Sequence, residues 1–308
     1  MRVVVTGARG QLGTDFVQVL GKEHEVFGFS HQELDVTDFD HTVEIITNLS
    51  PDIVIHAAAY TDVDGCELDP DKAYKVNALG TQNVAVACQK TNSSMLYIST
   101  DFVFDGRKTE PYTEFDIPNP ISVYGSSKLA GERYVSSLLL RYFIVRTAWL
   151  YGKHGKNFVK TILRLAEERE ELKVVNDQIG SPTYSLDLVQ AIAKLINTEW
   201  YGIYHITNSG NCSWFDFARK ILEYAGKKEV KVKPIGSAEL NRPAKRPAFS
   251  VLRNYCLELR GFPALRNYED ALKEYLSCLP AGNSLSSEEK SLNGGEIKGA
   301  LRLPRAPT

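Results

Sequence analysis

Tyr124 and Lys128 lie four residues apart and form the clearest candidate in the chain for proton transfer. The segment Ser126 to Leu140 contains one glycine and no proline, so we expect it to be a helix that places both side chains on one face. A free phenol has a pKa near ~10, and a neighbouring cation lowers it by stabilising the phenolate. Such a pair is suited to protonate the oxygen of a ketone while a hydride reaches the carbon.

A second tyrosine and lysine, Tyr224 and Lys228, have the same spacing. Gly226 and two lysines follow the apolar run Phe217 to Leu222, a pattern typical of the end of a helix. We therefore expect Lys228 to lie beyond the helix and off the face of Tyr224.

Three glycines near the N-terminus, Gly7, Gly10 and Gly13, form a candidate dinucleotide site. They follow the apolar run Val3 to Val5, which predicts a strand, and a helix is expected over Gln11 to Leu20. In a strand, turn and helix of this kind, bare backbone can approach a pyrophosphate.

The elements that position these residues alternate between strands and helices through the first half of the chain. Strands are expected at Val3 to Val5, Val26 to Phe29, Ile53 to Ile55, Met95 to Ile98 and Phe143 to Val145, and helices at Gln11 to Leu20, Phe39 to Asn48, Lys72 to Lys90 and Ser126 to Leu140. Such alternation is typical of α/β proteins. The predicted fold class is a Rossmann-type doubly wound parallel sheet with a smaller C-terminal α/β substrate lobe.

Ligands of open α/β sheets bind at the carboxyl ends of the strands. Thr6, Ala57 to Thr61, Ser99 to Asp101, and Thr147 to Trp149 follow predicted strands, so we expect them to line one crevice. Thr100 would then offer a hydroxyl to the ketone oxygen, although a threonine that only caps the strand end is an alternative.

The alternation loosens after about Gly152. We expect a NAD(P)-binding Rossmann domain over residues 1–151 and a substrate-binding lobe with returning sheet elements over 152–279. Helices are expected at Phe158 to Arg169, Leu186 to Asn197 and Trp214 to Tyr224, and a strand near Ile203 to Ile206. Residues 280–308 are rich in polar residues, Gly and Pro and lack aromatic residues, which predicts a disordered tail.

Composition excludes several classes of protein. The 308 residues are 43% hydrophobic and 24% charged, with a formal net charge of -2, so no nucleic acid partner is expected. No apolar run approaches the roughly 20 residues that span a bilayer, and no signal peptide pattern is present, so we expect no membrane association and a cytoplasmic location. The five cysteines are odd in number and widely spaced, which indicates reduced thiols that lie mostly in the core.

The motif Thr-Gly-x-x-Gly-x-x-Gly resembles the extended branch of the short-chain dehydrogenase/reductase superfamily. Further segments, in the same order, resemble the dTDP-4-dehydrorhamnose reductase family: Ala57 to Asp64, Val76 to Ala78, Ser99 to Gly106, Arg146 to Tyr151, and Asn176 to Thr183. The resemblance extends from Arg2 to Leu279. It implies NADPH-dependent reduction of the C4 ketone of dTDP-4-dehydro-L-rhamnose to dTDP-L-rhamnose, a step of nucleotide-sugar biosynthesis.

The resemblance also implies roles for individual residues. The catalytic set is Tyr124, Lys128 and Thr100, and Lys128 would also hold the nicotinamide ribose. The implied cofactor-binding residues are Gly7, Arg9, Gly10, Gln11, Leu12, Gly13, Ser30, Asp35, Val36, Ala57, Ala58, Ala59, Tyr124 and Lys128. The implied substrate-binding residues are Thr61, Val63, Asn77, Thr100, Trp149 and Arg246, with the loop Gln178 to Thr183 near the ligand.

Several of these residues have alternatives. Trp149 is a good surface for a sugar or base ring, with a core tryptophan as the alternative. Arg246 would pair with the diphosphate, or lie on a solvated basic loop. Asp35 would touch adenine, or serve as a carboxylate before a helix.

Cofactor preference follows from the end of the second strand, Phe29-Ser30-His31, which has no carboxylate to bind a ribose 2′-hydroxyl. Arg9 lies inside the glycine turn, where its guanidinium would meet a 2′-phosphate. We therefore expect NADPH, with NADH tolerated.

No metal is expected, since the six histidines have no metal-ligand spacing. Some relatives hold a divalent ion between subunits; Asp15 corresponds to one ligand, but Leu186 stands where another is expected. The chain would be a monomer or a homodimer.

Two alternative functions stay open: a non-catalytic NADP-binding regulatory subunit of the methionine adenosyltransferase type, and a related nucleotide-sugar ketoreductase or epimerase.

Overall fold

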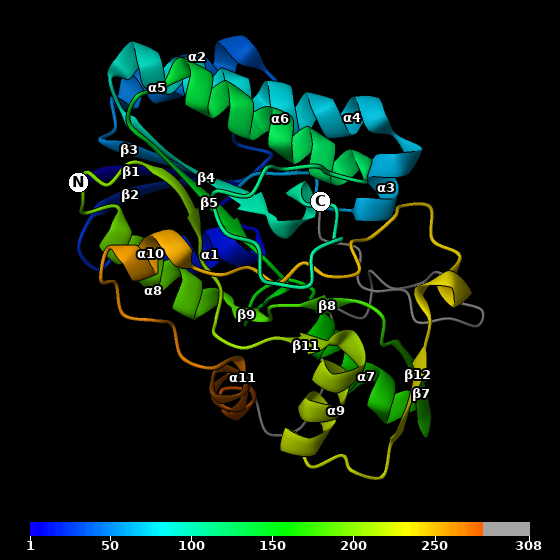
Figure 1. Ribbon diagram of the computed structural model, residues 1–308. Coiled ribbons are helices and arrows are strands. Elements are labelled where there is room, and N and C mark those ends of the chain that lie inside the picture. The colour runs from blue at the N-terminus through cyan, green and yellow to red at the C-terminus, as the bar shows by residue number, and fades with distance from the viewer. Residues whose placement is uncertain (280–308) are drawn as a thin grey trace.

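A six-stranded parallel sheet lies at the centre of the protein (Figure 1). The structure is a computed structural model that describes residues 1–279, and the predicted tail over 280–308 lies outside the described residues. The strand order is β10-β5-β4-β3-β1-β2. The strands are β1 (Arg2–Thr6), β2 (Glu25–Phe29), β3 (Ile53–His56), β4 (Ser94–Thr100), β5 (Tyr142–Thr147) and β10 (Gly202–His205). After β2 the chain returns to the other side of β1, which makes the sheet doubly wound, as predicted.

Helices cover both faces of this sheet. One face carries α2 (Phe39–Leu49), α5 (Thr81–Thr91) and α6 (Val123–Leu138), and the other carries α1 (Gln11–Leu20), α8 (Ser185–Leu195) and α10 (Tyr255–Leu259). Because side chains alternate along a strand, Val3 and Val5 pack in one core cluster while Val4 packs in the other. All three valines are fully buried. A strand that is buried on both faces needs apolar residues at every position, which explains the continuous apolar runs in the sequence.

Two helices differ from the prediction. The single helix expected over Lys72 to Lys90 is α4 (Pro70–Tyr74), a π-helical stretch η1 (Lys75–Gly80) and then α5. Helix α6 begins three residues before the predicted start because the Ser122 hydroxyl caps it by accepting a hydrogen bond from the Gly125 N–H at 3.1 Å. Tyr124 therefore lies in the first turn of α6. Two short elements flank this region, α3 (Val63–Leu68) and the 3-10 turn η2 (Asp101–Val103).

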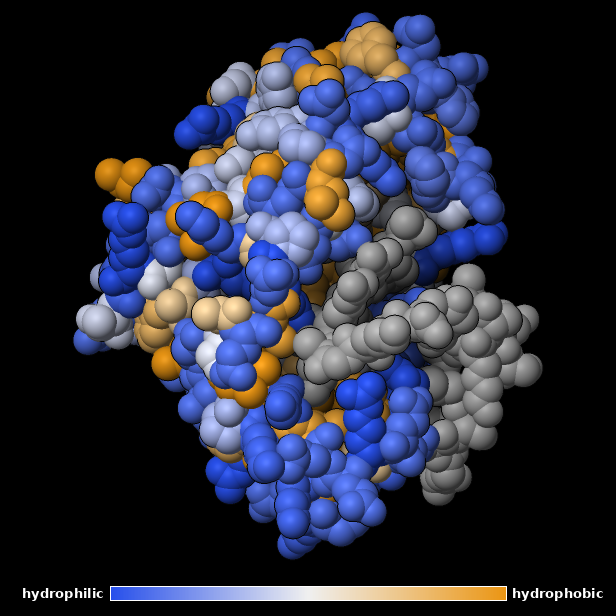
Figure 2. All heavy atoms as spheres, turned by 90° about the vertical axis from the view of Figure 1, so that its right-hand side faces the viewer, coloured by the Kyte–Doolittle hydropathy of each residue, from blue (hydrophilic) through white to orange (hydrophobic). Residues whose placement is uncertain are grey.

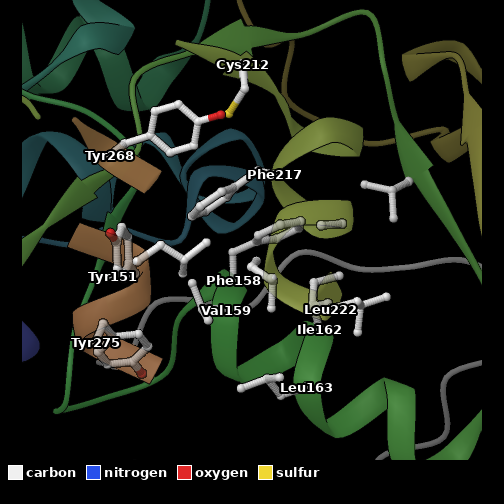
Figure 3. Packing of buried hydrophobic residues seen from close by; sticks show 14 of the residues in the cluster. Tyr151, Phe158, Val159, Ile162, Leu163, Cys212, Phe217, Leu222, Tyr268 and Tyr275 are labelled. Carbon is white, nitrogen blue, oxygen red and sulfur yellow. The ribbon is translucent and has the colours of Figure 1, made fainter. Parts of the chain in front are cut away.

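The C-terminal part of the chain builds a second core below the sheet in Figure 1. Its helices are α7 (Phe158–Glu168), α9 (Trp214–Tyr224) and α11 (Tyr268–Ser277). Three short strand pairs accompany these helices: β7 (Glu171–Val175) with β12 (Lys231–Ile235), β8 (Ile179–Gly180) with β11 (Cys212–Ser213), and β6 (Leu150–Tyr151) with β9 (Thr183–Tyr184). A 3-10 turn, η3, spans Ser237–Leu240. Figure 3 shows Tyr151, Phe158, Phe217 and Tyr275 packed together in this core. The predicted strand near Ile203 to Ile206 is β10, which returns to the edge of the main sheet.

The face of the molecule in Figure 2 is mostly hydrophilic, with hydrophobic residues scattered over it. None of the helices formed by residues 1–279 combines the length and the apolar character needed to cross a bilayer. The five cysteines are free; Cys66, Cys88 and Cys212 are buried, as predicted for most of them, whereas Cys256 is half-buried and Cys278 is exposed. The predicted end of α9 is also confirmed, since the helix stops at Tyr224 and Gly226 adopts a left-handed φ of 73°.

Candidate active site

The glycine turn after β1 packs closely against the end of β3. A Cβ atom on Gly7 would lie 2.8 Å from the Ala58 backbone nitrogen, and one on Gly13 would lie 2.1 Å from the Gly7 carbonyl oxygen. Both positions therefore require glycine. Gly10 is the N-cap of α1 and provides no side chain to accept from the first N–H groups of the helix. These free donors, at the positive end of the helix dipole, fit the diphosphate of a dinucleotide.

The structure brings Tyr124 and Thr100 together, as predicted. A hydrogen bond joins the Tyr124 hydroxyl to the Thr100 side chain. The Thr100 hydroxyl also donates to Asp101 Oδ1 at 3.1 Å, and the Tyr124 ring meets the Phe102 ring edge to face at a centroid distance of 5.6 Å. Two hydroxyls at the carboxyl end of β4 are thus held where a carbonyl oxygen can receive both.

Lys128 lies one turn further along α6 in a nearly dry position. Its side chain is only 3% exposed, and its Nζ lies 4.1 Å from the centroid of the Tyr97 ring. The Tyr97 hydroxyl donates to the carbonyl oxygens of Asn77 and Lys128, each at 3.3 Å, which ties β4 to α6. Burial lowers the pKa of Lys128 to about 7, although the negative charge of Glu132 opposes this shift.

The expectation that Lys128 lowers the pKa of Tyr124 is wrong for the protein without ligands. Burial raises the pKa of Tyr124 well above its usual value, and the hydrogen bond with Thr100 offsets this only in part. Burial likewise raises the pKa of the neighbouring Asp101 to about 6. The phenol therefore stays protonated at neutral pH, which is the state that a proton donor needs.

Replacement of Lys128 by methionine should raise the melting temperature of the ligand-free protein at pH 7. The pKa of Lys128 is about 7 in the folded protein and 10.5 in the reference state, so the unfolded chain binds more protons between these values. The contribution of Lys128 to the free energy of unfolding therefore rises with pH across that window. Thermal unfolding at pH 7 and pH 9 should show the variant more stable at both, with a smaller advantage at pH 9. A variant less stable than the wild type at pH 7 would contradict the assigned burial cost.

Asn77, which is predicted to bind substrate, is engaged in contacts within the protein. It is fully buried, and its amide is completely engaged. The amide oxygen accepts from the Tyr60 N–H at 2.8 Å, and the amide nitrogen donates to the Tyr60 carbonyl and the Ser127 hydroxyl, each at 3.0 Å. Asn77 therefore fixes the loop after β3 against α6. Thr61 in that loop and Val63 at the start of α3 are half-buried.

Two predicted substrate residues, Trp149 and Arg246, line one cavity of about 40 Å³ together with Gln178, which belongs to the loop expected near the ligand. The other lining residues are Phe102, Trp214, Pro247 and Ser250. Trp149 adopts a left-handed φ of 46° and stacks on Trp214 with ring centroids 3.5 Å apart. A pocket for a drug-sized ligand is typically at least about 300 Å³, which is larger than this cavity.

Arg246 is not on a solvated loop. Its guanidinium donates to both carboxylate oxygens of Asp64 on α3, at 3.0 and 2.9 Å, and its side chain is 10% exposed. The bond joins the C-terminal part of the chain to the end of the sheet where Thr61 and Val63 lie. Trp214 has no predicted role and Asp64 is named only as part of a motif, because no spacing in the sequence links either residue to its partner.

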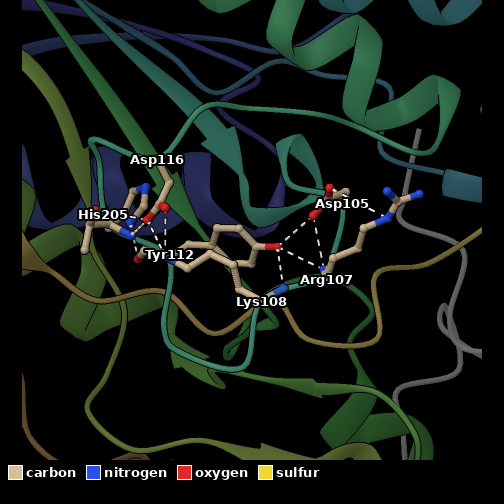
Figure 4. Close-up of polar contacts among 7 residues, drawn as sticks. Asp105, Arg107, Lys108, Tyr112, Asp116 and His205 are labelled. Atoms are coloured by element: carbon tan, nitrogen blue, oxygen red, sulfur yellow. Dashed lines mark hydrogen bonds and ion pairs between the residues drawn. The ribbon is translucent and has the colours of Figure 1, made fainter.

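The segment between Thr100 and Tyr124 is held by a polar network (Figure 4). The Tyr112 hydroxyl donates to Asp105 Oδ1 at 2.9 Å and accepts from the Arg107 N–H at 3.1 Å. Lys108 Nζ contacts both carboxylate oxygens of Asp116, at 2.7 and 2.8 Å. This network fixes the chain that connects the two predicted catalytic hydroxyls.

The residues predicted for the adenosine end lie beyond β1 and β2. Arg9 Nη2 lies 3.9 Å from Glu33 Oε1 at an exposed position, and Glu33 also accepts from the Ser30 N–H at 2.8 Å. Asp35 accepts from the Thr37 N–H at 2.9 Å and so shapes the turn before α2, while Val36 is buried against η1.

The other predicted cofactor residues surround the glycine turn. Ala57 to Ala59 follow β3 and are partly exposed. Leu12 packs into the core through its side chain, which leaves its backbone for the ligand, and Gln11 Oε1 accepts from Asn157 Nδ2 at 3.4 Å.

Residues 1–279 contain no group of three or more His, Cys, Asp or Glu side chains placed to hold a metal ion. Asp15 accepts a hydrogen bond from the Ser185 hydroxyl and lies 3.7 Å from His154 Nε2.

A doubly wound sheet with a glycine turn after β1 and a tyrosine and lysine one turn apart defines an extended short-chain dehydrogenase/reductase. Within this class, the chain belongs to the family described as the RmlD substrate binding domain, whose model matches residues 1–280.

Relatives of known name cover nearly the whole chain. The dTDP-4-dehydrorhamnose reductase of Aggregatibacter actinomycetemcomitans is 45% identical, over 84% of this chain and 90% of its own. The spore coat polysaccharide biosynthesis protein SpsK of Bacillus subtilis is 41% identical, over 89% and 96%. A crystal structure of dTDP-4-dehydrorhamnose reductase from Bacillus anthracis, in complex with NADP, matches with a TM-score of 0.88 and 48% identity, over 90% of this chain and 98% of that one.

Proposed function

We propose that this chain reduces the C4 ketone of dTDP-4-dehydro-L-rhamnose to dTDP-L-rhamnose with NADPH, in nucleotide-sugar biosynthesis. The observation that carries the proposal is the hydrogen bond between Tyr124 and Thr100 at the same sheet edge as the glycine turn. Relatives named dTDP-4-dehydrorhamnose reductase, and the NADP complex among them, support the substrate and the cofactor.

Different residues of the chain bind the cofactor, orient it and transfer the proton. NADPH, when bound, supplies the hydride that adds to C4. The N–H groups at the start of α1 hold the diphosphate, and Lys128 holds the nicotinamide ribose. Tyr124 gives its hydroxyl proton to the ketone oxygen as negative charge develops there, and Thr100 shares that oxygen through its own hydroxyl. The C=O bond becomes CH–OH, and a proton from water restores Tyr124.

The substrate occupies the cavity between the two cores. Trp149 and Trp214 move apart to accept a ring, and Arg246 faces the diphosphate. Residues 1–151 form the cofactor domain and residues 152–279 the substrate lobe, with β10 as the returning strand. The chain acts in the cytoplasm, as a monomer or a homodimer. The regulatory subunit and the epimerase gain no support, since these relatives are named reductases.

A panel of dTDP-linked 4-keto-6-deoxysugars, each offered with NADPH and with NADH, tests the substrate and the cofactor together. We expect the highest kcat/KM for the rhamnose precursor with NADPH. Isomerisation of the sugar without net cofactor use would assign the chain to the epimerases instead.

Replacement of Arg9 by glutamine should weaken NADPH binding roughly tenfold and leave NADH binding unchanged. A charge-assisted bond to a 2′-phosphate contributes about 1.5 to 3 kcal/mol, and a tenfold change in Kd is about 1.4 kcal/mol. NADH has no 2′-phosphate to lose this contact. Fluorescence titration with both cofactors measures the effect, and equal weakening of both would exclude the assigned role of Arg9.

A further inference from the structure

Glu132 lies one turn beyond Lys128 on α6 and is only 3% exposed. Its Oε1 accepts from Arg146 Nε at 2.9 Å, and its Oε2 accepts from Arg146 Nη2 at 2.7 Å. Oε1 also accepts from the Ser99 hydroxyl. Glu132 has no predicted role, Ser99 is predicted only to line the crevice, and Arg146 is named only as part of a motif.

The partners of Glu132 stand directly before functional positions. Ser99 precedes Thr100 on β4, and Arg146 precedes Thr147 on β5, which leads to Trp149. Ser99 and Arg146 are paired across the two strands, as are Thr100 and Thr147. One carboxylate therefore fastens α6, which carries Tyr124 and Lys128, to the ends of both strands.

The charge of Glu132 also acts on the buried Lys128. Lys128 Nζ lies over the Tyr97 ring on β4, and its charge acts on the buried His56 on β3. Tyr124 precedes Lys128 by one turn on α6. Burial lowers the pKa of His56 to about 3 and raises the pKa of both tyrosines, so all three are neutral near pH 7. Among residues 1–279, Glu132 is the acidic group whose charge acts on Lys128, while Arg146 on β5 is paired with that same carboxylate.

We propose that Glu132 is a positioning residue of the reductase: its carboxylate, held by Arg146 and Ser99, sets the place of α6 against β4 and β5 and keeps the buried Lys128 charged for cofactor binding. This inference rests on the proposed function, in which Lys128 holds the nicotinamide ribose. Without the carboxylate, Lys128 loses its proton at a lower pH and binds the ribose hydroxyls less well.

The test must separate this role from a purely structural one. Removing one partner of a buried ion pair leaves an unpaired charge, whereas replacing both with apolar side chains is often neutral for stability. The decisive variant is therefore the double replacement Glu132→Met with Arg146→Met, and Glu132→Gln is the second. The control is Asp187→Asn, because Asp187 forms a bidentate pair with Arg266, at 2.8 Å for each bond, away from the catalytic hydroxyls.

We would measure melting temperature and the Kd for NADPH from pH 5.5 to pH 9, using cofactor fluorescence. We would compare the NADPH affinity of the wild type with that of the Glu132 variant whose melting temperature lies within a few degrees of it. We expect its NADPH affinity to begin to fall about one pH unit lower than in the wild type, and to be roughly fivefold to tenfold weaker near pH 7.5. Asp187→Asn should keep the wild-type pH profile.

A folded Glu132 variant with the wild-type Kd profile would overturn the proposal, and so would variants whose only change is a lower melting temperature. The cofactor titration needs no sugar substrate. A wild type that binds NADPH but does not reduce the dTDP-sugar would refute the proposed function and leave the role of Glu132 to be judged by the pH profile alone.

Discussion

Replacement of Tyr124 by phenylalanine is expected to lower kcat by about 10² to 10⁴ while the Kd for NADPH stays within about twofold. General acid catalysis by a positioned side chain contributes a factor of this size. The substitution removes only the hydroxyl that bonds Thr100, and the ring keeps its edge-to-face contact with Phe102. Pre-steady-state mixing of the enzyme–NADPH complex with substrate measures the chemical step directly.

The chain offers a matched control in Tyr224, which has a lysine at the same spacing. Its hydroxyl donates to Glu269 on α11, far from the sheet edge, so Tyr224→Phe should leave kcat unchanged. An equal loss in both variants, or a Tyr124→Phe variant with wild-type kcat, would remove Tyr124 from the proposed role.

Replacement of Gly13 by alanine is expected to weaken NADPH binding more than about 100-fold. The new methyl group would lie 2.1 Å from the Gly7 carbonyl oxygen and 2.8 Å from Ala8 Cα. Both contacts are with backbone, so the turn itself must move, and the N–H groups that receive the diphosphate move with it. Cofactor fluorescence titration measures the loss.

Gly236→Ala is the control for this substitution. Gly236 has a φ of -80°, and an added Cβ would have no atom nearer than 3.8 Å. It should bind NADPH as the wild type does. A Gly13→Ala variant that keeps its affinity would mean that the cofactor diphosphate does not use this turn.

Local sequence patterns predicted the sheet and most helices well. Apolar runs predicted every strand of the main sheet, including the less buried edge strands β2 and β10, and α1 and α9 begin and end where their patterns do. The errors have local causes. Ser122 extends α6 because its hydroxyl caps the helix, and the π-helical stretch η1 interrupts a segment whose composition suits one regular helix.

The candidate site was predictable where its chemistry rests on residues close in sequence, as for Tyr124 and Lys128. It was not predictable where distant segments meet. Arg246 reaches Asp64 from 182 residues away, and Trp149 stacks on Trp214 only because the chain doubles back through β8 and β11. The sign of the pKa shift of Tyr124 was missed for a related reason: the spacing places a cation nearby, but burial depends on the whole fold.

The central claim is that this chain moves a hydride to C4 of a dTDP-linked 4-keto sugar while Tyr124 protonates the oxygen. The most direct test uses NADPH that carries deuterium on the transferred position of the nicotinamide, with dTDP-4-dehydro-L-rhamnose as substrate, and NMR of the product. We predict one deuterium at C4 of dTDP-L-rhamnose for each NADPH consumed. Unlabelled product, deuterium at any other carbon, or no consumption of NADPH would contradict the claim.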